Sequence, residues 1–140
     1  MIRKFKTDEL DSVMKIWLET NIKAHYFINE SYWRENYKMV KEMLPDATIF
    51  VWEDNYVIRG FVGLVGNNIA GIFVHADSQS QGIGKALLDY AKENYQELSL
   101  QVYKKNVRAV KFYLREKFIV TKEQIDENTG EVELVMNWVK

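Results

Sequence analysis

Apolar residues near the start of the chain recur at the spacing of an amphipathic helix. The stripe comprises Leu10, Val13, Met14, Trp17 and Leu18, and it predicts a helix with one buried face. A short strand at 2–6 is expected before it, and Thr7 is expected to cap the helix. A second helix is predicted over 30–44, ending before Pro45 because a residue that precedes proline avoids the helical conformation.

The pattern then changes to short apolar runs separated by turn residues. These runs predict strands at 47–53, 56–65 and 68–75, with turns at Asp54-Asn55 and at Gly66-Asn67-Asn68. The rest of the chain predicts a helix at 82–95, a strand at 97–103, a helix at 106–116 and a hairpin that pairs 118–126 with 131–138. This order, β-α-α-β-β-β-α-β-α-β-β, predicts an α/β protein with a mixed sheet covered by helices on both faces.

Length and composition narrow the class of protein. The 140 residues, 47% apolar and 28% charged, predict one globular domain over 1–140. The net charge of −1 gives no reason to expect nucleic acid or an anionic membrane as a partner. No apolar stretch follows the basic N-terminus, so a cytoplasmic protein is expected. The absence of cysteine excludes disulfides and a thiol nucleophile, and two histidines cannot form a three-histidine metal site.

A glycine-containing junction between a strand and a helix carries most of the chemical information. Gln79-Ser80-Gln81-Gly82-Ile83-Gly84 lies between the apolar run that ends at Val74 and the helix that begins near 82. Glycines allow a tight turn and a close approach of the backbone to a ligand. The free N–H groups of the first helical turn and the helix dipole favour an anion at this place. The junction therefore predicts a site for pyrophosphate, although a simple glycine turn that caps a helix has the same appearance.

Two common phosphate-binding motifs fit this junction only in part. A P-loop needs a hydroxyl for Mg²⁺ where this chain has Ala86, and a glycine where it has Gln79. A dinucleotide-binding loop needs its third glycine where this chain has Leu87. The pattern that fits throughout is [QR]-x-x-G-x-[GA], which resembles the acetyl-CoA loop of the GNAT N-acetyltransferases.

A second block strengthens the resemblance. The segment from Asn106 to Phe118 is similar to the GNAT pattern N-x-x-A-x-x-F-Y-x-x-x-G-F, with Ala109, Phe112 and Tyr113 in place. Lys117 departs from the pattern, because glycine usually ends the helix there in a left-handed conformation; lysine is expected to cost roughly 1 kcal/mol. Segments 16–20, 25–28, 32–33 and 51–53 also resemble small bacterial YiaC-type GNATs, which are described as protein lysine acetyltransferases.

The resemblance implies which residues would bind each part of acetyl-CoA. The two strands that flank the loop and its helix would separate, and the backbone of Ile72, Phe73 and Val74 would bind the pantetheine arm of acetyl-CoA. The junction would bind the pyrophosphate, mainly through its backbone N–H groups. The cofactor-binding set implied there is Gln79, Gln81, Gly82, Ile83, Gly84, Lys85 and Ala86. Asn106, Ala109 and Phe112 would complete the site, with Asn106 binding the pantetheine or capping its own helix.

Tyr113 is the candidate acid, because a phenol beside the thioester can protonate the departing coenzyme A thiolate. The base is open among His25, Glu19, Glu53 and His75, with His25 preferred. A base is needed because a lysine amine of pKa about 10.4 is neutral in about one molecule in 2,500 at pH 7, a cost of roughly 4.6 kcal/mol. Without cysteine, direct transfer in a ternary complex is expected.

Residues 98–115 contain no acid and five basic residues: Lys104, Lys105, Arg108, Lys111 and Arg115. If the helix begins early, 104, 108, 111 and 115 share a face, which would either meet the cofactor's 3′-phosphate or stay solvated. The sequence thus predicts an acetyl-CoA-dependent N-acetyltransferase that acts on a primary amine, plausibly of a protein lysine. A small-molecule amine and a non-catalytic acyl-CoA-binding module are the alternatives. No metal is expected, and a monomer and a homodimer are both compatible with the sequence.

Overall fold

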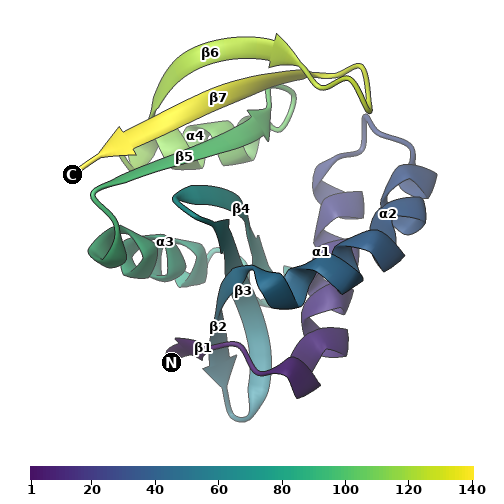
Figure 1. The fold of residues 1–140 in the computed structure, drawn as a ribbon, viewed down its shortest axis with the longest axis vertical. Coiled ribbons are helices and arrows are strands. Elements are labelled where there is room, and N and C mark those ends of the chain that lie inside the picture. Colours follow the sequence, from purple (N-terminus) through teal and green to yellow (C-terminus); the bar gives the residue numbers. More distant parts are fainter.

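A computed structural model describes all residues, 1–140, and shows a seven-stranded sheet with four α-helices (Figure 1). The strands are β1 (Ile2–Lys4), β2 (Thr48–Asp54), β3 (Val57–Val65), β4 (Asn68–Val74), β5 (Glu97–Tyr103), β6 (Ile119–Ile125) and β7 (Val132–Val139). The helices are α1 (Leu10–Ala24), α2 (Glu30–Met43), α3 (Ile83–Asn94) and α4 (Val107–Arg115). This is the predicted order of elements, and the predicted mixed α/β architecture is confirmed.

The sheet has the order β1-β2-β3-β4-β5-β7-β6, and only the β4–β5 pair is parallel. Figure 1 shows α1 and α2 on one side of β2, β3 and β4, and α3 on the other. Two apolar cores match this arrangement. One contains Leu87 and Leu88 of α3, and the other contains Val13, Met14 and Trp17 from the predicted stripe of α1. No helix is long and apolar enough to cross a membrane.

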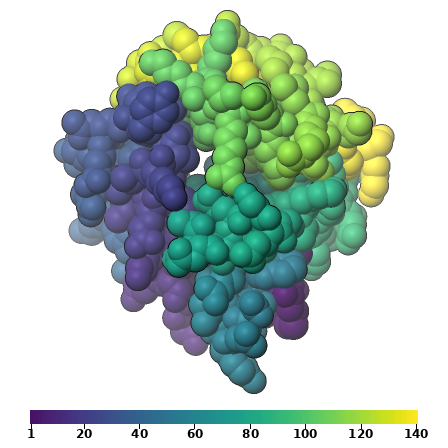
Figure 2. Space-filling view, turned by 180° about the vertical axis from the view of Figure 1, so that it is seen from behind, coloured from purple at the N-terminus to yellow at the C-terminus, as the bar shows by residue number.

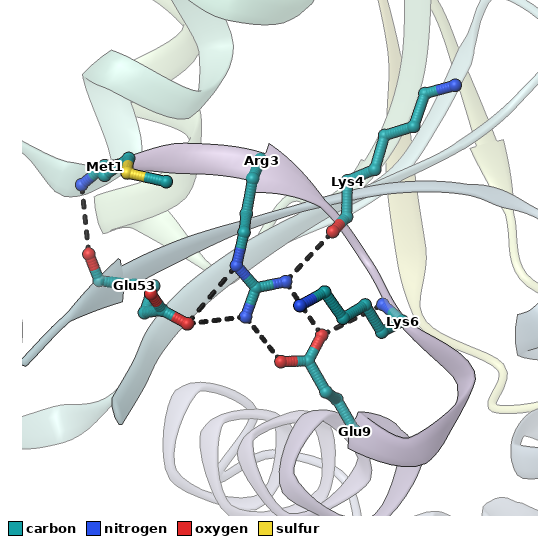
Figure 3. A network of polar contacts seen from close by, with 6 residues as sticks. All are labelled: Met1, Arg3, Lys4, Lys6, Glu9 and Glu53. Atoms are coloured by element: carbon teal, nitrogen blue, oxygen red, sulfur yellow. Dashed lines mark hydrogen bonds and ion pairs between the residues drawn. The ribbon is translucent and has the colours of Figure 1, made fainter. Parts of the chain in front are cut away.

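The start of α1 corrects the predicted cap. Thr7 begins a short 3₁₀ turn, Thr7–Glu9, and α1 itself starts at Leu10. The side chain of Glu9 accepts a hydrogen bond from the Lys6 backbone N–H over 2.9 Å. Arg3 holds this carboxylate together with that of Glu53 (Figure 3). The strand predicted over 2–6 ends at Lys4, and this ion-paired cluster then connects β1, β2 and the beginning of α1.

Two further boundaries differ from the sequence prediction. α2 ends at Met43, but Pro45 lies inside a 3₁₀ turn, Leu44–Asp46, that continues the chain from the helix. Proline is compatible with such a turn because it stands in the first positions, where its missing N–H is not needed. Helix α4 begins at Val107, so Lys104 precedes it in the turn after β5. Lys104 therefore does not belong to the basic helix face that was predicted.

Lys117 adopts the left-handed conformation that glycine would have supplied, with φ = +76°. The Phe118 N–H donates to the Tyr113 carbonyl over 3.0 Å, and the Lys117 N–H donates to the Leu114 carbonyl over 3.1 Å. These two bonds form a Schellman motif, and the Phe118 and Tyr113 rings pack edge to face above it. The helix C-terminus questioned by the sequence is thus a regular cap that carries a strained lysine.

Candidate active site

The centre of the sheet opens between β4 and β5. These strands pair only at Asn68 with Ser99 and at Ile69 with Leu100. On its other edge, β4 carries one extra residue, Ala70, against β3, since Leu64 pairs with Ile69 and Gly63 pairs with Gly71. Such a bulge bends a strand and increases its twist. The separation that the family resemblance implied is therefore present, and the rest of β4 has no backbone partner on the β5 side.

A cavity of about 670 Å³ lies at this opening. Figure 2 shows a gap in the surface between the purple and blue N-terminal part, the green segment near α4 and the teal segment before α3. The walls come from α1, β4, the β4–α3 junction and α4. The predicted cofactor-binding residues all line the cavity except Gln81 and Ala86, and Tyr113 and His25 line it as well. The sequence reasoning missed the lining residues Thr20, Asn21, Ala24, Ser78 and Ser80; it placed the lining residues Arg108 and Arg115 on a basic face that would either meet the cofactor's 3′-phosphate or stay solvated.

Of these missed residues, those of α1 had a readable signal. Thr20, Asn21 and Ala24 are small or polar and lie within one turn near the C-terminus of the amphipathic helix α1. Side chains at i and i+4 share a helix face, so this turn presents a short, partly polar surface to its surroundings. Because α1 packs beside β4, that surface becomes one wall of the cavity.

The junction provides a row of backbone donors. From Gln81 to Lys85, no backbone N–H has an acceptor within the protein. Ala86 differs, because its N–H donates to the Gly82 carbonyl over 3.0 Å as the first bond of α3. The expectation that Ala86 donates to a phosphate is therefore corrected, and four donors of the first turn, from Gly82 to Lys85, remain.

The two glycines of the junction have different reasons to be glycine. Gly82 has φ = +82° and precedes α3 as its N-cap, a conformation that side chains with a Cβ rarely adopt. Gly84 is helical, and a Cβ there would lie 3.8 Å from both Phe112 and Val74, two residues of the cavity wall. The space beside Gly84 is thus the cavity itself. The free N–H donors, the two glycines that carry no side chain and the nearby guanidinium of Arg108 together fit a pyrophosphate.

Asn106 connects the two walls of the cavity. Its Oδ1 accepts from the Ala109 N–H over 3.3 Å and caps α4, which is one of the two roles expected for it from the sequence. Its Nδ2 lies 3.2 Å from Nε2 of His25, and the His25 Nδ1 lies 3.1 Å from the Asn21 carbonyl. A carbonyl requires a donor, so Nδ1 carries the proton and Nε2 accepts from the amide. Both ring nitrogens of His25 are therefore engaged.

His25 is enclosed by aromatic rings. It stacks on Trp33 at 5.1 Å between centroids and meets Tyr103 and Phe27 edge to face. Burial lowers the pKa of His25 to about 4, against a smaller opposing effect of the Asn21 carbonyl. A neutral imidazole with its lone pair occupied is a poor base for a lysine ammonium. The geometry supports a positioning role for His25 in place of the predicted catalytic one.

The other three candidate bases lie away from the main cavity. Glu53 is paired with Arg3 on the β1–β2 side (Figure 3). Glu19 and His75 line a smaller neighbouring cavity, which shares Thr20 and Gln79 with the main one. No carboxylate lines the main cavity.

Tyr113 is 7% exposed and lies in the cavity wall. Its ring packs against Phe112 and Phe118, and its hydroxyl has no hydrogen-bond partner in the protein. Burial raises the pKa of Tyr113 above its ordinary value. The phenol is therefore protonated at neutral pH, and the residue that carries this uncommitted donor lines the cavity.

The basic residues of 98–115 divide into two groups. Lys104 and Lys105 form ion pairs with Glu123 and Glu131 of the closing hairpin region. Arg108 and Arg115 line the cavity, whereas Lys111 is exposed and has no ion pair. Arg108 alone reaches the junction, where its guanidinium donates to Oε1 of Gln79 over 2.7 Å and to Oγ of Ser80 over 3.3 Å.

The sheet topology, the separated strands and the donor-rich junction define a protein of the N-acetyltransferase class. The model of the acetyltransferase (GNAT) family matches residues 10–118, and the chain belongs to this family.

Known proteins show the same relationship. The chain is 34% identical over 140 residues to the peptidyl-lysine N-acetyltransferase YiaC of Escherichia coli K12, covering 99% of this chain and 96% of that protein. The apo-form YjaB of Escherichia coli is similar in structure, with a TM-score of 0.87, 27% identity and coverage of 99% and 97%. The PaiA N-acetyltransferase of Thermoplasma acidophilum, solved with coenzyme A, has the same fold, with a TM-score of 0.78, 18% identity and coverage of 100% and 98%.

Proposed function

We propose that this N-acetyltransferase uses acetyl-CoA to acetylate the side-chain amine of lysine in proteins. The observation that carries the mechanism is the uncommitted hydroxyl of buried Tyr113 at the wall of the cavity. The lysine acceptor rests on the similarity to YiaC, a peptidyl-lysine N-acetyltransferase, over nearly the full length of both chains.

Bound acetyl-CoA would supply an acetyl group activated as a thioester. The unpaired edge of β4, at Ile72, Phe73 and Val74, is suited to bind an extended amide-containing arm in the manner of an added strand. The N–H groups from Gly82 to Lys85 are suited to bind its pyrophosphate. The walls would then hold the reacting carbonyl in one orientation.

The chemistry requires a bond from the acceptor nitrogen to the acetyl carbon and the loss of the carbon–sulfur bond. Tyr113 would donate its phenolic proton to the departing sulfur and regain a proton from solvent. A lysine ammonium must lose two protons, one before it attacks and one as the amide forms. Since no carboxylate lines the cavity and His25 has its lone pair engaged, both would pass to solvent.

A thiol-release assay tests the proposal. The substrates are an N-terminally blocked peptide with one lysine, the same peptide with arginine, and a panel of small amines. Release of coenzyme A only with the lysine peptide, together with a mass increase of one acetyl group, supports the proposal. Turnover of small amines alone would indicate a small-molecule acetyltransferase, and tight binding without turnover would indicate an acyl-CoA-binding module.

A further inference from the structure

The hydrogen bonds of Arg108 extend across the mouth of the cavity. Arg108 comes from α4, whereas its partners Gln79 and Ser80 belong to the β4–α3 junction on the opposite side. Figure 2 shows a narrow bridge of green atoms from the α4 part of the chain to the teal junction segment. All three residues line the cavity.

Gln79 continues this chain of hydrogen bonds into the cavity. Its Nε2 donates to the Val74 carbonyl over 3.1 Å, and Val74 belongs to the open part of β4. The side chains of Arg108 and Gln79 thus span the mouth and occupy one backbone acceptor beside the cavity. These three hydrogen bonds are exposed or half-buried and join neutral acceptors, so each is weak compared with a bond to an anion.

We propose that Arg108 is a two-position residue: its guanidinium bonds to Gln79 and Ser80 across the cavity mouth, and it transfers to a pyrophosphate oxygen of the bound cofactor. The inference rests on the proposed use of acetyl-CoA. Ser80 directly precedes the row of free N–H donors, so an anion held there lies beside the guanidinium. A guanidinium binds a phosphate through two parallel N–H donors, which are stronger than its bonds to an amide and a hydroxyl. Its departure also frees Gln79 to leave the Val74 carbonyl.

Binding measurements on the whole chain test this assignment. Calorimetry compares coenzyme A and dephospho-coenzyme A, which lacks only the 3′-phosphate, in the natural chain and in Arg108→Gln. The variant is expected to weaken both ligands by the same factor, about tenfold to a hundredfold. Lys111→Gln is the matched control. Lys111 lies one turn from Arg108 and outside the cavity wall, and its substitution removes an equal charge. The effect of this variant on affinity is expected to stay below about twofold.

Two further measurements separate binding of the phosphate from support of the loop. In a Gln79→Ala background, Arg108→Gln must still weaken coenzyme A; loss of the effect there would mean that Arg108 acts only through Gln79 and would overturn the assignment. The side-chain amide signals of Gln79 in an NMR spectrum are expected to move when coenzyme A is added to the natural chain, and unchanged signals would contradict the transfer of Arg108.

The remaining outcomes are also decisive. Unchanged affinity in Arg108→Gln, or a loss seen with coenzyme A but not with dephospho-coenzyme A, would refute the pyrophosphate contact. Failure of the natural chain to bind coenzyme A would instead refute the proposed function on which this inference rests.

Discussion

The amide of Asn106 and the imidazole of His25 lie 3.2 Å apart, although 81 residues separate them in the chain. Through this contact the C-terminus of α1 is joined to the N-terminus of α4, the helix that carries Tyr113. The Asn106 amide accepts from the Ala109 N–H through Oδ1, and it can donate to His25 through Nδ2 only while the His25 Nε2 is unprotonated. The protonation state of one half-buried ring therefore bears on the geometry of the cavity.

Stability should depend on His25 in a defined pH range. Its pKa is about 4 in the folded chain and near 6.5 when unfolded. Between these values the unfolded chain takes up a proton that the folded chain does not. The stabilisation is complete above pH 6.5 and is lost as the pH falls through 4, by up to about 3 kcal/mol. Urea unfolding of the natural chain and of His25→Gln at several pH values should show their difference shrinking from pH 7 to 4. A constant difference would be inconsistent with this environment.

Tyr113→Phe tests the acid. The substitution removes one hydroxyl that has no protein partner, so melting temperature and coenzyme A affinity should hardly change. Turnover should fall by about 10²–10⁴, mostly in kcat. Melting curves and coenzyme A titrations provide the controls. A stable variant with full activity would leave solvent as the source of the proton.

Gly84 offers a graded test of the pyrophosphate site. A Cβ at this position meets only ordinary contacts with Phe112 and Val74, so Gly84→Ala should fold and retain most of its coenzyme A affinity. The two extra methyl groups of Gly84→Val would enter the cavity and should abolish binding, measured by calorimetry, without loss of the fold. Equal affinity of the two folded variants would argue against a phosphate at this place.

Lys117 predicts a stabilising substitution. Because its φ of +76° is unfavourable for any residue with a Cβ, Lys117→Gly should raise the free energy of unfolding by about 1 kcal/mol. Lys117→Ala is the matched control, since it removes the same side chain but keeps the Cβ, and it should give no such gain. Denaturant titrations of the three proteins measure the difference, and equal stabilities would exclude strain at this cap.

The rate of acetyl transfer should increase with the fraction of the acceptor lysine that is a free amine. With no carboxylate in the cavity wall, kcat/KM for a lysine peptide should rise about tenfold per pH unit from 7 towards the amine pKa near 10.4. The initial rate of thiol release, corrected for enzyme stability at each pH, provides the profile. A plateau below pH 8 would reveal a base that serves the acceptor, and Glu19→Gln would then be the first variant to examine.

Much of the fold was accessible from the sequence, because strong local signals agree with the tertiary structure. The apolar stripe of α1, the glycine junction and the Asn106 cap each act over a few residues. What could not be predicted depends on long-range partners. Glu9 replaces Thr7 as the decisive residue at the start of α1 because Arg3 and Glu53 come together there. The engaged state of His25 likewise depends on Asn106, and the placement of Arg108 depends on Gln79.

The pairing of β4 with β5, which extends over only two residues of each strand, is the mechanically weakest part of the sheet. The N-terminal strand β1 belongs to one half of the sheet and the C-terminal strand β7 to the other. Tension applied to the two ends of the chain therefore acts across the β4–β5 pairing. Only the pairs at Asn68 and Ile69 join the strands there. The sheet should part first at this pairing when the molecule is pulled. A ligand lying along β4 would share the load and raise the force needed to separate the halves.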